Sequence, residues 1–346
     1  MVVVLRGEAS LAAAVRVAVV GLVHDHVWKL LEQFAASGRA ELVAAVDPNA
    51  PLTERARREL GFQHALARMD DLWSLRPEAI LCCTANRDTA DVVEQAAAHG
   101  VPVMVEKPLA ANLAQARRIA AAAKRVPVMC NWPVAWDANI RHALDLARGD
   151  SLGSLYTMRY RAAHRGPREE GMSQYFWSWL YDAEQNGAGA LIDYCCYGSA
   201  LAALVLGLPT SVTAVKGRLV KTDIPVEDNA IILMQYPTAF ALAEACWTQA
   251  GNRPGGLQIL GHRAGLIIEG GRLLRVDQEH GQGAPVQVPP LPEGERNGPG
   301  YFLHCLDRGV EPAGLVSWQI GLDAQRILEA GLLASRSGSM VRPADL

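Results

Sequence analysis

A glycine and an aspartate, each at the end of an apolar run, are spaced like the key residues of a dinucleotide-binding site. Gly21 begins the sequence GLVHDH, so Val23 and His26 occupy the second and third glycine positions of a G-x-G-x-x-G fingerprint. In that fingerprint the first glycine makes the turn, the second admits the pyrophosphate and the third lets helix pack on strand. Asp47 ends a second apolar run about 20 residues on, where a carboxylate would bond a ribose hydroxyl and repel a 2′-phosphate. A plain Asp-Pro-Asn turn is the alternative.

The two histidines of the same turn could also be ligands of a metal ion. His24 and His26 are one residue apart, but no third or fourth ligand stands out beside them in the sequence. Structural zinc sites use four protein ligands and catalytic ones three. We therefore predict no metal site, and interpret these side chains as lining the phosphate turn or capping the helix that follows.

Glu106 and Lys107 follow an apolar run, residues 101–105. Ligands of open α/β sheets bind at the carboxyl ends of the strands, so this pair stands where a ligand would lie. A surface salt bridge is the alternative interpretation.

The elements that must position these residues alternate regularly through the first third of the chain. Continuous apolar runs alternate with helical patterns; the runs are 16–21, 41–47, 79–84, 101–105 and 126–130. This alternation is typical of a parallel sheet covered on both faces, and the right-handed crossover makes it doubly wound. We therefore predict an α/β fold whose first domain, residues 1–130, is of Rossmann type.

Beyond residue 130 the rhythm changes to half-polar runs separated by turns. Strands are expected at 154–163, 210–219, 229–236, 239–248, 256–260 and 265–269. Such strands predict an α+β domain, residues 131–346, with an open and mostly antiparallel sheet. A helix is expected at 190–206, a long surface loop at 281–300, and a last helix at about 316–335 that packs back toward the first domain.

The composition excludes several classes of protein. The 346 residues carry 33 Lys and Arg against 36 Asp and Glu, a net charge of −3, which argues against a nucleic-acid or anionic-membrane binder. Seven cysteines without a Cys-x-x-Cys motif indicate reduced, buried thiols and a cytoplasmic protein. We interpret the N-terminal stretch as a leader into the first strand rather than a signal peptide. The apolar stretch 188–208 contains Asp193 and several glycines, so it is a poor membrane span.

Three segments resemble the family of glucose–fructose oxidoreductase and inositol dehydrogenase (the Gfo/Idh/MocA family). In residues 79–110 a Thr-Pro-Asn-type loop, a helix, a glycine, a strand and a Glu-Lys-Pro element follow one another, although Ala85 replaces the proline and Thr89 a frequent histidine. The sequence GAGALIDYCCY, ending at Tyr197, is similar to the family's glycine-rich helix start with Asp and, four residues on, His. The sequence VEDN at 226–229 leads into a strand pair typical of the second domain.

The resemblance implies an enzyme that transfers a hydride between nicotinamide and a carbinol or carbonyl carbon of a sugar, polyol or related small molecule. Residues implied to contact the cofactor are Gly21, Val23, His24, Asp47, Thr84, Asn86, Glu106 and Lys107. NAD is expected because Asp47 is followed by no arginine that would bind a phosphate, and NADP is the alternative.

The resemblance also implies a catalytic set of Lys107, Asp193 and Tyr197. Some members, acting as dihydrodiol, xylose or glucose–fructose oxidoreductases, carry tyrosine where many have histidine. A spacing of four puts Asp193 and Tyr197 on one helix face. We expect Tyr197 to be the acid/base, with a pKa lowered by Lys107, and Asp193 to orient Lys107 or a substrate hydroxyl. A core position for Tyr197 is the alternative.

Substrate contacts are expected from residues of the second domain, since tryptophan faces suit the apolar faces of sugar rings. The candidates are Trp132, His164, Arg165, Trp177, Trp179 and Asp228. Core or interface positions are the alternative for the tryptophans. A homodimer or homotetramer through the open sheet is expected from the family. Two other functions stay open: an NAD-using sugar lyase or glycosidase without net redox, and an inactive nucleotide-binding sensor, which the altered glycine turn favours.

Overall fold

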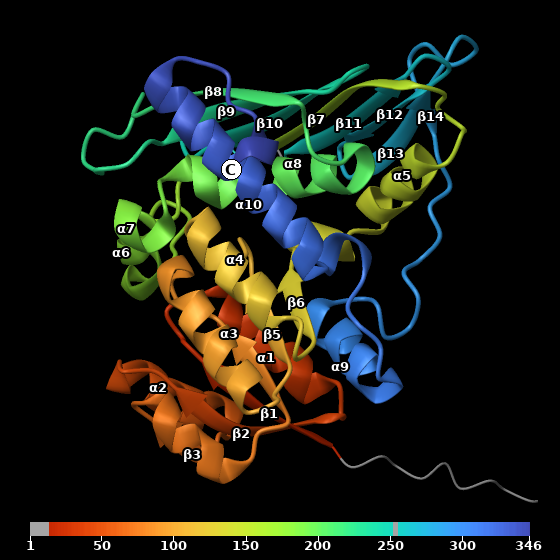
Figure 1. Ribbon diagram of the computed structural model, residues 1–346. Helices are drawn as coiled ribbons and strands as arrows, with labels where there is room; N and C mark the ends of the chain where they lie inside the picture. The colour runs from red at the N-terminus through yellow and green to blue at the C-terminus, as the bar shows by residue number, and fades with distance from the viewer. Residues whose placement is uncertain (1–13, 252–254) are drawn as a thin grey trace, which may run out of the picture.

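Two sheets with helices between them make up the protein (Figure 1). The structure, a computed structural model, describes residues 14–251 and 255–346. The expected N-terminal leader lies outside the described residues. Helices α8 (Ala190–Leu206) and α10 (Trp318–Ser337) lie between the second sheet and the first domain.

The first sheet has six parallel strands in the order β3-β2-β1-β4-β5-β6, which confirms the predicted doubly wound class. Its strands are β1 (Val15–Val20), β2 (Ala40–Val46), β3 (His64–Leu66), β4 (Ala79–Cys82), β5 (Val103–Glu106) and β6 (Val128–Asn131). Helices α1 (His26–Ala36), α2 (Ala50–Leu60), α3 (Thr89–Ala98) and α4 (Leu113–Ala122) alternate with them. Strand β3 was not predicted, because its three residues are exposed or half-buried and form no apolar run.

The second sheet has eight strands in the order β14-β13-β12-β11-β7-β10-β9-β8. They are β7 (Leu155–Ala163), β8 (Ser211–Gly217), β9 (Asn229–Gln235), β10 (Phe240–Cys246), β11 (Gly256–Gly261), β12 (Gly265–Glu269), β13 (Arg272–Val276) and β14 (Ala284–Pro285). Only the central pair β7 and β10 is parallel, so the prediction of a mostly antiparallel sheet is confirmed. On the face away from the helices Val215, Ile231 and Phe240 are exposed; the homo-oligomer through this face stays a prediction.

The sequence analysis did not predict several helices of the second domain. Helices α6 (Gln174–Leu180), α7 (Ala183–Asn186) and α9 (Gly298–Arg308) were not predicted; α5 (Ala138–Arg148) precedes them. Helix α9 begins inside the segment 281–300 that was expected to be loop only, and the Asn297 side chain caps it by accepting from the Gly300 N–H. An asparagine cap followed by Gly-Pro-Gly gave no apolar periodicity that would mark a helix.

The helices between the sheets join the two domains. Helix α10 contacts both α8 and α4, and Glu329 of α10 accepts from the Leu113 N–H at the start of α4. Among the described residues, the segment Ala183–Leu206 is long and apolar enough to cross a membrane. Most of it is buried against β10 and α10, as in the core helix of a folded domain. All seven cysteines are free and buried, as predicted.

Candidate active site

Lys107 and Asp193 form a buried ion pair where the two domains meet. Lys107 follows β5, and Asp193 lies in the first turn of α8. The lysine Nζ lies 2.6 Å from Asp193 Oδ1 and 3.3 Å from the Asp193 carbonyl oxygen, and both side chains are almost fully buried. Burial alone would lower the pKa of Lys107, but the charge and hydrogen bond of Asp193, together with the other acidic groups nearby, outweigh it and raise that pKa. Lys107 therefore remains an ammonium at neutral pH.

Two residues that sequence reasoning did not select fix Asp193. Trp247 Nε1 donates to Asp193 Oδ2 over 3.2 Å, so the protein occupies both carboxylate oxygens. Glu227 accepts from the Gly189 and Leu191 N–H groups and so holds the first turn of α8. The geometry thus favours the role of orienting Lys107 over that of contacting a substrate. Trp247 ends a predicted strand, but nothing in the sequence linked it to a residue 54 positions earlier.

Tyr197 lies one helical turn after Asp193. The Lys107 Nζ is 5.1 Å from the centroid of its ring, and the ring of Trp132 is 6.0 Å away. Burial, reinforced by the nearby carboxylates of Asp193 and Glu106, raises the pKa of Tyr197 well above its usual value. The expectation of a lowered pKa is wrong, because burial dominates and Asp193 already neutralises the Lys107 ammonium. Tyr197 is therefore a neutral phenol, a proton donor, at neutral pH.

Two clefts are candidate ligand sites, and Tyr197 lines the larger of them. One, of about 800 Å³, runs over the carboxyl edge of the first sheet and is lined by Gly21, Val23, Asp47 and Thr84, with Trp179 opposite. The other, of about 1250 Å³, lies in the second domain and is lined by residues that include Tyr197 and two further tyrosines, Tyr160 and Tyr194. The first has the place of a nucleotide site and the second that of a substrate site.

The turn after β1 requires its glycine. Gly21 has φ +82°, and a Cβ there would lie 2.5 Å from the Thr84 backbone nitrogen. Asp47 Oδ2 accepts from the Leu22 N–H at 2.6 Å, while Oδ1 accepts from the Asn49 N–H at 2.7 Å. Asp47 therefore holds both turns while lining the nucleotide cleft, so the turn and ribose roles are compatible with each other.

His24 and His26 differ in how far they fill the expected role of lining the turn or capping the helix: His24 Nδ1 accepts from the His26 N–H, at the first residue of α1, over 3.3 Å, whereas the His26 ring turns to Glu106. His24 is buried against Phe176, with ring centroids 4.5 Å apart, and burial lowers its pKa, so the ring is neutral. His26 Nδ1 lies 2.7 Å from Glu106 Oε1, while Glu106 Oε2 accepts from the Asn131 side-chain amide at 2.6 Å. The N-cap of α1 is Asp25, which makes no side-chain cap bond.

Helix α6 of the second domain covers the turn instead. The two Asp25 carboxylate oxygens accept from the Ser173 N–H and hydroxyl, each at 2.6 Å. Trp179 Nε1 donates to the Val23 carbonyl oxygen at 3.4 Å. Trp179, expected to contact substrate, therefore lies over the nucleotide turn.

Asn86 lies outside the nucleotide cleft, although its neighbours Thr84 and Ala85 line it. The Asn86 side-chain amide donates to the Asn186 carbonyl at 3.2 Å and to its side-chain oxygen at 2.8 Å. Both asparagines are buried, so this contact joins the domains.

The expected substrate residues divide into two groups. Trp132 and His164 lie beside the catalytic cluster, with the His164 ring 4.7 Å from that of Tyr194. Burial lowers the pKa of His164. Trp177 instead lines a separate shallow hollow with Arg168.

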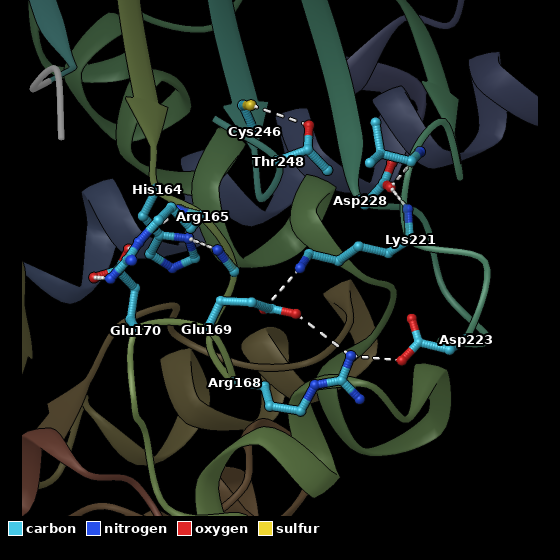
Figure 2. Close-up of polar contacts among 12 residues, drawn as sticks. His164, Arg165, Arg168, Glu169, Glu170, Lys221, Asp223, Asp228, Cys246 and Thr248 are labelled. Atoms are coloured by element: carbon cyan, nitrogen blue, oxygen red, sulfur yellow. Dashed lines mark hydrogen bonds and ion pairs between the residues drawn. The ribbon is translucent and has the colours of Figure 1, made fainter. Parts of the chain in front are cut away.

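Arg165 and Asp228 belong to a network that ties two loops together (Figure 2). Arg165 pairs with Glu170. Figure 2 shows Glu169 between Lys221 and Arg168, with Lys221 Nζ 2.7 Å from Glu169 Oε2. The carboxylate of Asp228 accepts three backbone N–H groups, from residues 219 to 221, which lower its pKa against the effect of burial. Asp228 therefore holds a loop, and we do not retain it as a substrate contact.

Two family models match the sequence. One, the GFO/IDH/MocA oxidoreductase family with an NAD-binding Rossmann fold, covers residues 15–132, and the GFO/IDH/MocA C-terminal domain covers residues 140–267. The chain belongs to the Gfo/Idh/MocA family. The resemblance in the motifs is thereby confirmed, and with it the expected class, an NAD-dependent oxidoreductase. No curated protein matches the sequence.

Solved structures of Gfo/Idh/MocA-type proteins share the fold over nearly the whole chain. An Agrobacterium radiobacter oxidoreductase in complex with NAD+, L-tartaric acid and magnesium has a TM-score of 0.82 and 18% identity, covering 96% of this chain and 99% of that one. Aldose-aldose oxidoreductase from Caulobacter crescentus, complexed with glycerol, has a TM-score of 0.79 and 23% identity, covering 95% and 99%. The WlbA dehydrogenase from Bordetella pertussis, in complex with NADH and UDP-GlcNAcA, has a TM-score of 0.79 and 19% identity, covering 95% and 98%.

The residues of this Gfo/Idh/MocA chain fit NAD at the first cleft. Gly21 leaves the space that a Cβ would fill, and the cleft follows the carboxyl edge of the parallel sheet. Val23 lines the cleft, and His26 turns toward Glu106. The departures from the glycine fingerprint therefore leave the cleft in place.

Proposed function

We propose that this chain transfers a hydride between NAD and a carbinol or carbonyl carbon of a sugar- or polyol-like molecule. The observation that carries the proposal is the buried Lys107–Asp193 pair beside Tyr197, which lines the larger cleft, in a chain that also has a nucleotide cleft at the edge of the first sheet. Hydroxylated ligands in the similar structures, L-tartaric acid, glycerol and UDP-GlcNAcA, support the substrate class.

Each residue of the cluster has one task in this reaction. Bound NAD supplies the carbon that gives or accepts the hydride. During reduction Tyr197, a neutral phenol, donates its proton to the carbonyl oxygen and is then reprotonated from solvent. During oxidation it first releases that proton to solvent, and the phenolate then accepts the proton of the carbinol hydroxyl. Lys107 keeps one N–H beyond the two that Asp193 accepts, and uses it to polarise the same oxygen. Asp193 and Trp247 hold the ammonium in place.

Cofactor choice rests on Asp47. Its carboxylate lines the nucleotide cleft at the end of β2, where it would bond ribose hydroxyls and repel a 2′-phosphate. We expect NAD+ to bind at least tenfold more tightly than NADP+, measured by titration of nicotinamide fluorescence with the reduced forms. Equal affinities would contradict this role of Asp47.

The experiment that tests the reaction uses Lys107→Ala and Tyr197→Phe in a panel of sugars and polyols with NAD+. We expect kcat to fall by about 10²- to 10⁴-fold in Tyr197→Phe, the usual contribution of a positioned acid/base, while NADH binding persists. Tyr156→Phe, at an exposed tyrosine, is the matched control. Undiminished turnover in both cluster variants would contradict the assignment.

A second candidate, an NAD-using lyase or glycosidase without net redox, is favoured by one observation. Helix α6 covers the nucleotide turn through Ser173 and Asp25, which suits a cofactor that is retained and reused. A product that loses water or a sugar unit without accumulation of NADH would select this reaction. The assembled Lys107–Asp193 pair argues against an inactive sensor.

A further inference from the structure

Three metal-ligating side chains meet beside the nucleotide turn, outside the catalytic cluster. His24 and His26 belong to the turn after β1, and Glu106 ends β5. Each offers one ligand atom, and these atoms all lie within 4.8 Å of one another. The sequence offered only the two histidines, because Glu106 is 80 residues from His26.

We propose that His24, His26 and Glu106 bind a divalent transition-metal ion such as Zn²⁺. Two imidazole nitrogens and a carboxylate oxygen are the donor set that zinc and its neighbours accept, whereas Mg²⁺ and Ca²⁺ prefer all-oxygen sites. Three protein ligands are the number found in open zinc sites, which keep a further position for water or an oxygen of a bound molecule.

The surroundings of the cluster orient its ligands. Glu106 Oε2 accepts from the Asn131 amide, and Asn131 Oδ1 in turn accepts from Trp136 Nε1 at 2.8 Å. His24 is packed between other rings, with centroids 4.5 Å from Phe176 and 5.6 Å from Trp179. Such contacts to the ligands tune metal sites, and their loss typically costs about 10- to 100-fold in affinity.

Access and charge are also compatible with an ion. The His26 side chain is 38% exposed, which opens the cluster to solvent, while that of Glu106 is 3% exposed. Lys107 follows Glu106 in the sequence, and Asp193 already neutralises its charge at 2.6 Å. Without an ion, His26 and Glu106 form the hydrogen-bonded pair seen at 2.7 Å, which a bound ion would replace with two coordinate bonds.

The test is metal binding by the full chain, measured without turnover. Chelator-treated protein is titrated with Zn²⁺ by calorimetry and with Co²⁺ by visible absorption, both with and without NAD+. We expect one ion per chain, a Co²⁺ spectrum that Zn²⁺ abolishes, and no comparable binding of Mg²⁺. Because activity is not the readout, failure here would leave the proposed hydride transfer untouched.

Variants of the proposed ligands test where the ion binds. Glu106→Gln keeps the shape of the carboxylate and its partner Asn131, and His26→Asn keeps a polar group, so both retain the fold as checked by circular dichroism. Each is expected to weaken binding at least tenfold. His99→Asn, at a histidine stacked on Trp73 on another part of the first domain, is the matched control and should bind as the unaltered chain does. The absence of stoichiometric binding in the unaltered chain, or equal binding by all three variants, would overturn the proposal.

Discussion

The nucleotide turn and the catalytic cluster lie at the same edge of the first sheet, but different forces shape them. At the turn, backbone conformation decides: Gly21 has φ +82° and has no room for a Cβ against Thr84. At the cluster, charge decides: Lys107 and Asp193 are both buried and have each other as ionic partners, 2.6 Å apart.

This difference predicts which kind of substitution disrupts each region. A turn held by local backbone geometry is damaged by one added methyl group and keeps its charges. A buried pair drawn from two domains is damaged by removing one member, because the other charge is left without a partner. Variants of Lys107, Gly21, Tyr197 and Ser173 separate the two kinds of failure.

Lys107→Met should have the largest effect. It leaves the Asp193 carboxylate buried without its ammonium, which costs about 3–5 kcal/mol of unfolding free energy, and turnover should be lost. Urea denaturation measures the free energy of unfolding, and NADH formation measures turnover. Adding Asp193→Leu should restore most of the stability but none of the activity, since an apolar pair needs no charge compensation. A double variant as unstable as Lys107→Met would show that packing, not charge, holds this junction.

Gly21→Ala should come next and act on the other region. A non-glycine residue in the left-handed region costs about 1–2 kcal/mol, and here the Thr84 backbone must also move. Gly61→Ala is the matched control, because Gly61 has φ +73° and an added methyl group there would meet nothing within 4 Å. Only Gly21→Ala should weaken NADH binding, by at least tenfold. Equal losses of stability and unchanged NADH affinity in both variants would remove the turn from the cofactor site.

A pH profile distinguishes the catalytic cluster further. In the unfolded chain Tyr197 ionises near pH 10, whereas its pKa in the folded protein is raised well above that by burial. Above pH 10 the folded state therefore holds a proton that the unfolded state has lost, and stability falls as pH rises. In Tyr197→Phe this fall should be shallower by about 1.4 kcal/mol per pH unit, measured by denaturation between about pH 10 and 11.5. Identical slopes would mean that Tyr197 ionises alike in both states.

The sequence predicted the features that local pattern controls. Buried parallel strands are continuous apolar runs, so the first sheet could be predicted except for the short, exposed β3. The position of Lys107 after such a run placed it at the ligand-binding edge. The same reasoning located Gly21 and Asp47 at the ends of their strands.

Contacts between distant segments could not be predicted. Trp247 to Asp193, Asn86 to Asn186 and Ser173 to Asp25 join residues 54 to 148 positions apart, and no periodicity encodes such pairs. The direction of the Tyr197 pKa shift was wrong for the same reason. It depends first on how deeply the ring is buried and then on the charges around it, and only the folded arrangement settles both.

The smallest predicted effect lies where α6 covers the nucleotide turn. Ser173→Ala removes the hydroxyl that donates to Asp25 over 2.6 Å but keeps the backbone N–H bond to the same carboxylate. The same hydroxyl also caps α6 by accepting from the Phe176 N–H, so two bonds of about 1 kcal/mol each are lost, and the variant should fold normally while α6 opens more often. We expect NADH to dissociate about two- to fivefold faster in stopped-flow experiments, a factor within that energy. Ser151→Ala, which removes a hydroxyl bond to the Leu146 carbonyl far from the turn, should leave the rate unchanged. Equal rates in the two variants would show that α6 does not retain the cofactor, and would withdraw the observation that favours a reaction without net redox.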